Sequence, residues 1–492
     1  MKIRKSYVLK FLAISCAVLL LIVAVLSLMA SDNVLTKAAR NSDMITINAK
    51  YDSEAKTLTA MQTVRYKNRS NDALPHIKFH IYANAYREGA KFPPVTSSDE
   101  ERAFPNGKSY GGIHINEVRL PLAQVGVPVL IEGDDKNVLS VPLFQPLRPN
   151  QSIDIFLEYT VQLANIAHRL GWTDDVVNLG NFYPVPVIYE GGQWQAYPYS
   201  FNGDPFYNAL HNFDVTLQCD LMIASSGTLV REGRYKASAI RDFAMVLSKS
   251  FKSLTRVVSG VAVNYFYLTD ERPTESLQCA VDSLKTFSKL FTKYPYKQLT
   301  VVQTDFLHGG MEYGELVYVS NGLERDLHNQ VIIHEIAHQW WYGIIGNNQA
   351  RSAWIDEGLA EYSTLLFYDH NPQYSRFNRA EMIDNARSNF ATYAKVVQAV
   401  GGTIDTMNRD LNSFRSTHEY VYMTYVRGML LFCDLEMLLG QDLVAGALRA
   451  FASEAQFSFA TQDKLISSME KSTCVALRTF FESFLTGVNT LT

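Results

Sequence analysis

The stretch that decides the fold is H-E-I-A-H at residues 334–338, inside the apolar run of residues 331–345. Side chains four positions apart share one face of a helix, so His334 and His338 can point at the same zinc ion. Glu335 lies one step round the helix, where a carboxylate can accept a proton from water beside that ion. The pentapeptide therefore predicts a helix over residues 331–345 that carries a candidate zinc site.

A third ligand is required, because a catalytic zinc site has three protein ligands and one open position. After His338 there are 18 residues and then Glu357, within the run W-I-D-E-G-L-A-E-Y of residues 354–362. A second helix that begins near residue 354 and folds back would bring Glu357 over the histidines. Alone, Glu357 could be an ordinary acid in a first helical turn; after an intact metal motif, the ligand interpretation is favoured. Asp356 and Glu361 are expected to support the ligands or to face solvent.

The residues upstream of the motif have the pattern of a β domain. Residues 44–51 and 57–67 alternate polar and apolar side chains around a short polar turn, which predicts a hairpin. Further β-like runs follow, separated by Gly, Pro and Asn, whereas helical patterns prevail near the metal motif. The sequence predicts a multidomain α+β chain, with an N-terminal antiparallel β-sheet domain over residues 44–265 and a mainly helical zinc domain over residues 266–492.

The N-terminus has the pattern of a membrane anchor. Residues 11–30 are 20 residues without a charge, and such a helix spans about 30 Å of hydrocarbon. Residues 1–10 contain four basic side chains and no acid. The positive-inside rule then predicts a cytoplasmic tail at 1–10, a single transmembrane helix at 11–30 in the lipid bilayer of the cell membrane, a linker at 31–43 and an extracytoplasmic body. A cleaved signal peptide is the alternative, although its apolar region usually covers only about 7–15 residues.

The composition bounds the size of the core and the kinds of partner. The chain has 492 residues, of which 47% are hydrophobic and 19% are charged, and its formal net charge is −4. This supports a large core and about three structural units. The sequence has no long run of Lys and Arg, which nucleic-acid binding usually needs. We expect no nucleic-acid partner, and the oligomeric state stays open.

With the metal motif in place, the sequence resembles the zinc aminopeptidase family of aminopeptidase N, a branch of the gluzincin metallopeptidases. The zinc signature of that family, His-Glu-x-x-His followed by 18 residues and Glu, matches His334, His338 and Glu357. The resemblance implies a thermolysin-like catalytic domain that holds one Zn²⁺ per chain. It also implies that Glu335 acts as the general base.

A second stretch, G-G-M-E-Y at residues 309–313, resembles the Gly-x-Met-Glu-Asn segment of the same family. The resemblance implies that Gly309, Gly310 and Met311 contact the substrate and that Glu312 binds its free α-amino group. Taken alone, a loop Glu is usually just solvated. The residue after Glu312 is a Tyr here, where the family usually has Asn.

A third stretch, Y-M-T-Y-V-R-G at residues 422–428, resembles the Tyr-x-Lys-Gly helix start of the family. The resemblance implies that the phenol of Tyr425 donates a hydrogen bond to the oxyanion of the reaction. Arg427 stands where the family has Lys and keeps the charge. Tyr422 lies one turn away and is the alternative donor.

The resemblance covers nearly the whole body after the predicted anchor. It implies a zinc aminopeptidase that removes N-terminal residues from extracytoplasmic peptides with a free N-terminus. Only 67 residues follow Tyr425, so we expect no long C-terminal helical domain of the kind that caps the site in many relatives, and we expect a more open cleft. An endopeptidase with such a cleft is the nearest alternative. A catalytically idle peptide-binding module on the cell surface is another.

Overall fold

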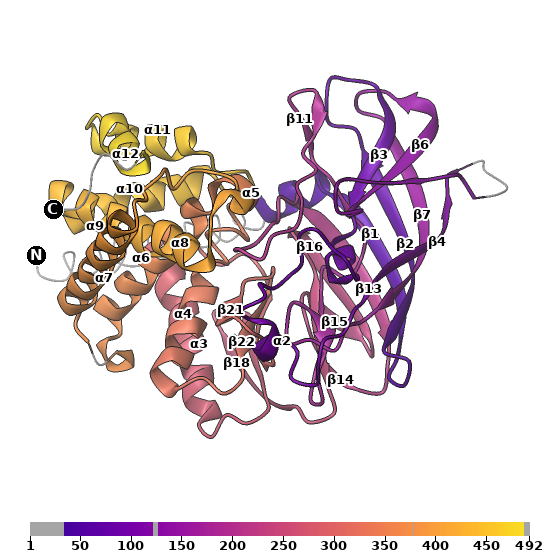
Figure 1. Ribbon diagram of the computed structural model, residues 1–492, viewed down its shortest axis with the longest axis horizontal. Helices are drawn as coiled ribbons and strands as arrows, with labels where there is room; N and C mark the ends of the chain where they lie inside the picture. Colours follow the sequence, from indigo (N-terminus) through magenta and orange to yellow (C-terminus); the bar gives the residue numbers. More distant parts are fainter. Residues whose placement is uncertain (1–33, 122–125, 376, 487–492) are drawn as a thin grey trace, which may run out of the picture.

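The computed structural model describes residues 34–121, 126–375 and 377–486, and it shows a β-rich unit beside a largely helical unit (Figure 1). The predicted tail at 1–10 and the predicted anchor at 11–30 lie outside the described residues. Among the residues that are described, no helix is long and apolar enough to cross a membrane. Residues 34–40 of the predicted linker are helical, and the first strand begins at Asp43.

The first unit is built around a seven-stranded sheet with the order β15-β16-β13-β1-β2-β7-β4. Its strands are β1 (Asp43–Asp52), β2 (Thr57–Lys67), β4 (Gly112–Arg119), β7 (Ser152–Gln162), β13 (His211–Gln218), β15 (Thr228–Arg231) and β16 (Arg234–Ile240). Neighbouring strands are antiparallel except β1 and β13, which are parallel. The predicted antiparallel β domain is therefore confirmed in its main sheet, with one parallel pair that the sequence did not indicate.

Three smaller sheets complete this unit. The first contains β10 (Val185–Pro186), β3 (Leu74–His80), β6 (Val138–Leu147) and β5 (Leu130–Glu132). The second contains β14 (Met222–Ser225), β17 (Ala244–Ser248), β9 (Val177–Gly180) and β8 (Leu170–Trp172). The third is the pair β11 (Tyr189–Glu190) and β12 (Gln193–Trp194). A short α2 (Glu100–Ala103) and the 3-10 turn η1 (Tyr82–Tyr86) lie in the connections.

The predicted hairpin is confirmed, because β1 and β2 pair antiparallel. The alternating side chains of β2 face the core. Leu58, Val64 and Tyr66 are all buried. Gln62 shares this face and is only 2% exposed. Its amide donates to the carbonyl of Pro184 at 2.8 Å and accepts from the Tyr159 hydroxyl at 3.1 Å. A buried polar side chain is tolerated when its hydrogen bonds are made, so Gln62 can occupy a position on the buried face of β2.

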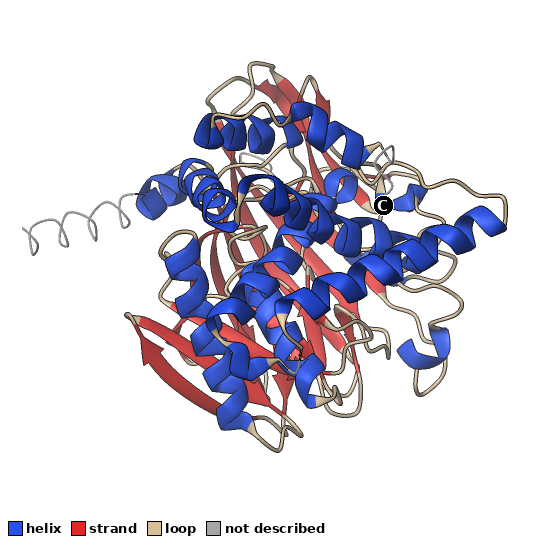
Figure 2. Cartoon of the chain, turned by 90° about the vertical axis from the view of Figure 1, so that its left-hand side faces the viewer, coloured by secondary structure: helices blue, strands red, loops and turns tan. Residues whose placement is uncertain are grey.

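The second unit combines a five-stranded sheet with helices, which lie in front of the strands in Figure 2. The sheet order is β18-β19-β20-β22-β21, from β18 (Lys252–Val258), β19 (Val261–Tyr267), β20 (Gln298–Thr304), β22 (Leu316–Ser320) and β21 (Gly310–Met311). β20 and β22 are parallel and wholly buried, as expected for strands covered on both faces. β21 is an edge strand, antiparallel to β22.

The first helix of this unit lies between β19 and β20 in the chain, and the others follow β22. The helices are α3 (Pro273–Leu290), α4 (Arg325–Ala337), α5 (Gln349–Ser352), α6 (Trp354–His370), α7 (Arg379–Ala399), α8 (Thr417–Val421), α9 (Arg427–Leu439), α10 (Gln441–Glu454), α11 (Gln462–Thr473) and α12 (Arg478–Leu485). Short turns are η2 (Pro372–Tyr374), η3 (Leu411–Ser413) and the π-helical η4 (Tyr422–Val426). The boundary predicted at residue 265 falls inside β19, and the sheet of the second unit already includes β18.

The helix that carries the metal motif is shorter than predicted. α4 ends at Ala337, and His338 caps it, so the predicted helix does not continue to residue 345. Trp340 and Trp341 are nevertheless buried, and Trp341 pairs with Ile345 in a short bridge. The apolar run therefore reflects burial in the core, which does not require helical backbone.

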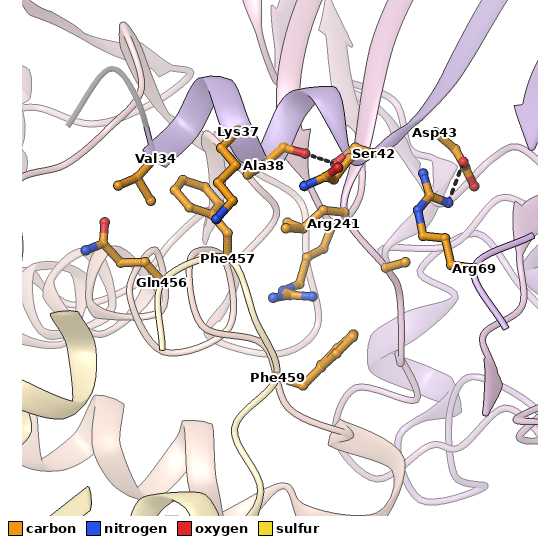
Figure 3. A pocket seen from close by; sticks show the side chains of 13 residues that line it. Val34, Lys37, Ala38, Ser42, Asp43, Arg69, Arg241, Gln456, Phe457 and Phe459 are labelled. Carbon is orange, nitrogen blue, oxygen red and sulfur yellow. Dashed lines mark hydrogen bonds and ion pairs between the residues drawn. The ribbon is translucent and has the colours of Figure 1, made fainter. Parts of the chain in front are cut away.

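Arg241 ties the two units together at a cavity of about 500 Å³ beside helical residues 34–40 (Figure 3). The side chain is fully buried, and its nitrogens donate to three backbone carbonyls: Tyr342 at 2.7 Å, Asn208 at 3.1 Å and Ser458 at 2.8 Å. Its guanidinium also stacks on Phe459, 4.5 Å from the ring centroid. One charged group thus satisfies carbonyls from segments far apart in the sequence.

Replacing Arg241 with Met is expected to lower the free energy of unfolding by about 3 kcal/mol, because three buried carbonyls lose a charged donor. Urea unfolding followed by fluorescence measures the change. Arg231→Met, at an exposed position of β15, is the matched control and is expected to change stability by less than about 0.5 kcal/mol. Equal effects of the two variants would contradict this role of Arg241.

Glu315 is a buried acid that makes the free energy of unfolding depend on pH. Its carboxyl is 3% exposed and accepts from the Gln298 amide at 3.3 Å, near the phenols of Tyr294 and Tyr296. Burial raises its pKa from 4.5 to about 8. Between about pH 4.5 and pH 8, the folded chain therefore keeps a proton on Glu315 that the unfolded chain has already lost.

We expect the contribution of Glu315 to stability to be complete below about pH 4.5 and to be lost as the pH rises through about 8. The Glu315→Gln variant has no such proton. Its free energy of unfolding is expected to equal that of the parent near pH 4.5. Near pH 9 its free energy of unfolding is expected to be higher than that of the parent, by on the order of 4 kcal/mol. Urea unfolding of both proteins at the two pH values measures this, and the same difference at both would contradict it.

Candidate active site

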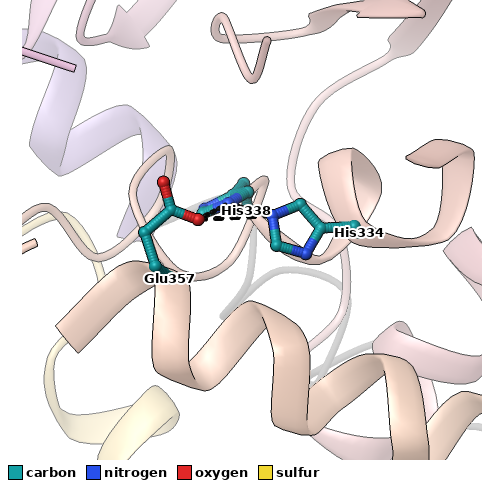
Figure 4. Close-up of side chains that lie close together, drawn as sticks. All are labelled: His334, His338 and Glu357. Atoms are coloured by element: carbon teal, nitrogen blue, oxygen red, sulfur yellow. Dashed lines mark hydrogen bonds and ion pairs between the residues drawn. The ribbon is translucent and has the colours of Figure 1, made fainter. Parts of the chain in front are cut away.

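The three predicted metal ligands converge on one point (Figure 4). His334 is on the last turn of α4, His338 caps that helix, and Glu357 is in the first turn of α6. The Nε2 atoms of the two histidines are 3.0 Å apart. Glu357 Oε2 lies 3.3 Å from Nε2 of His334 and 3.2 Å from Nε2 of His338. All three side chains are at least nine-tenths buried.

The other ring nitrogen of His338 is held by a hydrogen bond, because its Nδ1 donates to the carbonyl of Trp341 at 3.0 Å. This contact fixes the tautomer of His338 and leaves its Nε2 free to bind a metal. Nδ1 of His334 lies 3.1 Å from Glu361 Oε1, within ion-pair distance but without a hydrogen bond among the described residues. The supporting role expected of Glu361 agrees with this placement.

The donor set fits zinc. Two imidazoles and one carboxylate are a common catalytic zinc set, and bond lengths of about 2.0–2.1 Å in a tetrahedron place ligand atoms about 3.3 Å apart. The three observed spacings, 3.0, 3.2 and 3.3 Å, are close to that value. His334, His338 and Glu357 are therefore a set of described residues that could hold one Zn²⁺.

The carboxylate of Glu335 packs against the edge strand. Its Oε2 is buried and has no hydrogen-bond partner among the described residues. A Cβ placed on Gly310 would lie 2.3 Å from Glu335 Oε1, so a side chain at residue 310 would displace the carboxylate. The structure thus brings Glu335 beside the edge that Gly310 and Met311 form, while Gly309 lies at the exposed end of that strand.

Glu312 follows the edge strand directly and lies beside the same cluster of side chains. It is 3% exposed, and its Oε1 accepts from the Gln349 amide at 2.7 Å. Ligand-type atoms of Glu312, His338 and Asp356 all lie within 4.8 Å of one another. Tyr313, which replaces the family's Asn, is buried against Tyr318 and does not take part in this cluster.

Tyr425 is the tyrosine that reaches the ligand cluster. Its hydroxyl donates to Glu357 Oε1 at 2.6 Å, and its ring lies parallel to the His334 ring. The alternative, Tyr422, stacks on Tyr393 of α7 instead, with ring centroids 4.6 Å apart. Both belong to the π-helical turn η4, a local geometry that is frequent at functional sites. Arg427 is buried behind them, where it donates to the carbonyl of Phe484.

The cluster of acids and histidines favours positive charge. Burial raises the pKa of Glu335 to about 7. Burial also acts against the charge of His338, but the carboxylates of Glu357 and Glu312 outweigh it and raise the pKa of this imidazole to about 10. The pKa of Glu357 falls to about 2, because His338 and His334 outweigh the effect of burial. A divalent cation and an ammonium group would both be attracted to such a site.

Sequence reasoning missed three residues that surround the cluster. Asp204 is buried and pairs with Arg169 at 2.6 Å, and Arg169 Nε also lies 3.2 Å from the Met311 sulfur. Gln349 bridges Glu312 and Asp356. Asp204 and Arg169 come from the β-rich unit, so no local spacing could have connected them with the metal motif.

Comparison with known families finds a match over the part of the chain that contains the candidate zinc ligands. Residues 275–484 match the peptidase family M1 domain. Aminopeptidase M1-A of Oryza sativa subsp. japonica is 23% identical over 224 residues, which are 42% of this chain and 25% of that protein. Aminopeptidase N of Lactobacillus helveticus is 24% identical over 250 residues, which are 47% of this chain and 29% of that protein. The matches thus span less than a third of the length of these two relatives.

The fold is similar to solved structures along most of the chain. The M1 zinc metallopeptidase of Deinococcus radiodurans superposes with a TM-score of 0.61 at 14% identity, over 91% of this chain and 93% of that one. A mutant of that protein bound to a Tyr-Ser-Ala substrate gives a TM-score of 0.60 at 15% identity, over the same shares. This likeness shows a shared two-unit α+β fold.

Proposed function

Because residues 275–484 match the peptidase family M1 domain, we propose that the chain belongs to this family and acts as a zinc aminopeptidase, which removes the N-terminal residue of a peptide. The observation that carries this proposal is the position of Glu312. Its buried carboxylate lies within 4.8 Å of a ring nitrogen of the candidate ligand His338. A carboxylate so close to the metal site can bind the α-ammonium of a peptide and leave room for one residue before the scissile bond.

Each side chain has a role in this reaction. A bound Zn²⁺ would supply Lewis acidity and lower the pKa of a water molecule to about 7. Glu335 accepts the proton of the attacking water and passes it to the leaving amine. Tyr425 donates to the oxygen that becomes negative in the transition state. Glu312 fixes the ammonium, and the edge strand β21 offers its backbone to the extended peptide.

Replacing Tyr425 with Phe is expected to lower kcat about 100-fold and to leave KM within about threefold, because the phenol acts on charge that develops only in the transition state. Steady-state hydrolysis of an aminoacyl anilide measures both constants. Tyr422→Phe is the matched control, since this residue stacks on Tyr393 away from the ligands. An effect of Tyr422→Phe equal to that of Tyr425→Phe would contradict the assignment.

The decisive comparison for exopeptidase activity uses one peptide with a free N-terminus and the same peptide with an acetylated one. The zinc-loaded chain is expected to release the first residue of the free peptide and to leave the acetylated peptide intact, since an amide cannot serve as the cation for Glu312. Equal cleavage of both at internal bonds would indicate an endopeptidase. Peptide binding without cleavage of either would indicate an idle binding module.

The location of the catalytic body is also a proposal. The charge-free residues 11–30 after a basic tail support a single-pass anchor with an extracytoplasmic body, whose substrates would be extracytoplasmic peptides. The test is carbonate extraction of membranes from cells that express the full chain, followed by protease treatment of intact cells or spheroplasts. Retention in the membrane with digestion of the body supports the proposal, and a freely released chain would contradict it.

A further inference from the structure

Gln349 holds two buried carboxylates with one amide group. It begins α5, in the connection between the two helices that carry the candidate zinc ligands, and it is 1% exposed. Its Nε2 donates to Glu312 Oε1 and to Asp356 Oδ2, both at 2.7 Å. Because both neighbours are carboxylate oxygens, the amide must turn its nitrogen toward them, and both of its N–H groups are used.

The amide oxygen of Gln349 is left without a donor. Oε1 is buried and has no hydrogen-bond partner among the described residues. An unsatisfied buried acceptor costs about 1–3 kcal/mol, and such an exception calls for an explanation. Oε1 belongs to the same amide group whose Nε2 contacts the carboxylate of Glu312.

The proposed substrate brings the donor that is missing here. An α-ammonium has three N–H groups, and a single carboxylate does not satisfy all of them in a buried site. A further carboxylate would be costly, because burial and the neighbouring acids Asp204 and Glu335 already raise the pKa of Glu312 well above its usual value. A neutral amide oxygen adds an acceptor without adding charge.

On the basis of the proposed aminopeptidase function, we propose that Gln349 is the second acceptor of the amine subsite: its Nε2 holds the Glu312 carboxylate, and its Oε1 binds the α-ammonium of the substrate. Asp356 and Asn347 fix this amide in turn, since Asn347 Nδ2 donates to Asp356 Oδ1 at 2.6 Å. Asp356 directly precedes Glu357 on α6. The amine subsite is therefore connected to the ligand helix, which sets the distance between ammonium and metal.

The experiment uses Gln349→Met, which keeps the length of the side chain and removes both polar atoms. For the zinc-loaded chain we expect kcat/KM on a free-amine peptide to fall about 10- to 100-fold, mainly through KM, as for the loss of hydrogen bonds to a charged group. A direct binding measurement accompanies the kinetics. In the Glu335→Gln background, calorimetry is expected to show a similar loss of affinity for the free-amine peptide and none for its acetylated form.

Two further variants make the outcome decisive. Gln398→Met, exposed near the end of α7, is the matched control and should leave every constant unchanged. Gln349→Asn keeps an amide group on a side chain that is one methylene shorter, and it replaces the Met variant in the test if that variant fails to fold. It should also lower the preference for the free-amine peptide over the acetylated peptide, by at least about fivefold. Parent-like preference in either folded, zinc-containing variant would overturn the role of Gln349. Failure of the parent chain itself to prefer free amines would instead overturn the proposed function.

Discussion

Replacing Glu335 with Gln is expected to lower kcat about 1,000-fold while zinc stays bound at one ion per chain. Gln has the same shape but cannot accept a proton, and general-base catalysis contributes about 100- to 10,000-fold. Glu335 makes no described hydrogen bond through Oε2, so the substitution removes chemistry with little change in packing. Steady-state hydrolysis of an aminoacyl anilide measures the loss, and atomic emission measures the metal.

The control for this variant is Glu324→Gln, because Glu324 is an exposed acid at the start of the same helix. Its kcat and its zinc content should equal those of the parent. If Glu335→Gln retains more than about a tenth of the parent kcat with its zinc in place, Glu335 does not act as the general base.

Replacing Glu357 with Ala is expected to abolish stable zinc binding and with it all measurable peptidase activity. Only His334 and His338 would remain, and a catalytic site needs three protein ligands. The same variant also removes the acceptor of the Tyr425 hydroxyl. Metal content after gel filtration and a competitive titration with a zinc-binding dye both measure this loss without relying on activity.

Glu361→Ala is the graded comparison. Glu361 is 3.1 Å from Nδ1 of His334 but lies outside the ligand set, so its removal should weaken zinc affinity about 10- to 100-fold and not abolish binding. A Glu357→Ala protein that still holds one equivalent of zinc as tightly as the parent would show that the metal is bound elsewhere.

Both structural units contribute to the candidate site. Arg169 and Asp204 come from the β-rich unit, and they meet Met311 and the acidic cluster on the second unit. Arg241 adds hydrogen bonds from the first unit to the loop that follows the metal motif. The β-rich unit therefore contributes side chains next to the candidate site, and substitutions in it are expected to affect substrate binding.

The ligands were predictable from sequence because their chemistry depends on local geometry. Residues four apart on a helix must share a face, and the spacing to Glu357 matched a family signature. The comparisons agree with the predicted resemblance, since residues 275–484 match the peptidase family M1 domain and the fold is shared with an M1 zinc metallopeptidase. The choice of Tyr425 over Tyr422 agrees with the structure, although it came from resemblance and not from periodicity.

The parts that sequence did not predict depend on tertiary contacts. The end of α4 at Ala337 was missed, because the following tryptophans are apolar for reasons of burial and not of helical period. Gln349 looks like an ordinary polar residue of a connection until the fold brings it between Glu312 and Asp356. Asp204 joins the same cluster from the other unit.

The most direct test of the central claim is a zinc titration of the metal-free full chain, followed by release of the N-terminal residue from a peptide with a free amine. Activity is expected to be absent without metal, to rise linearly with added zinc and to reach its maximum at one ion per chain, with no cleavage of the acetylated peptide. A chain that binds one zinc ion and releases no N-terminal residue would contradict the account.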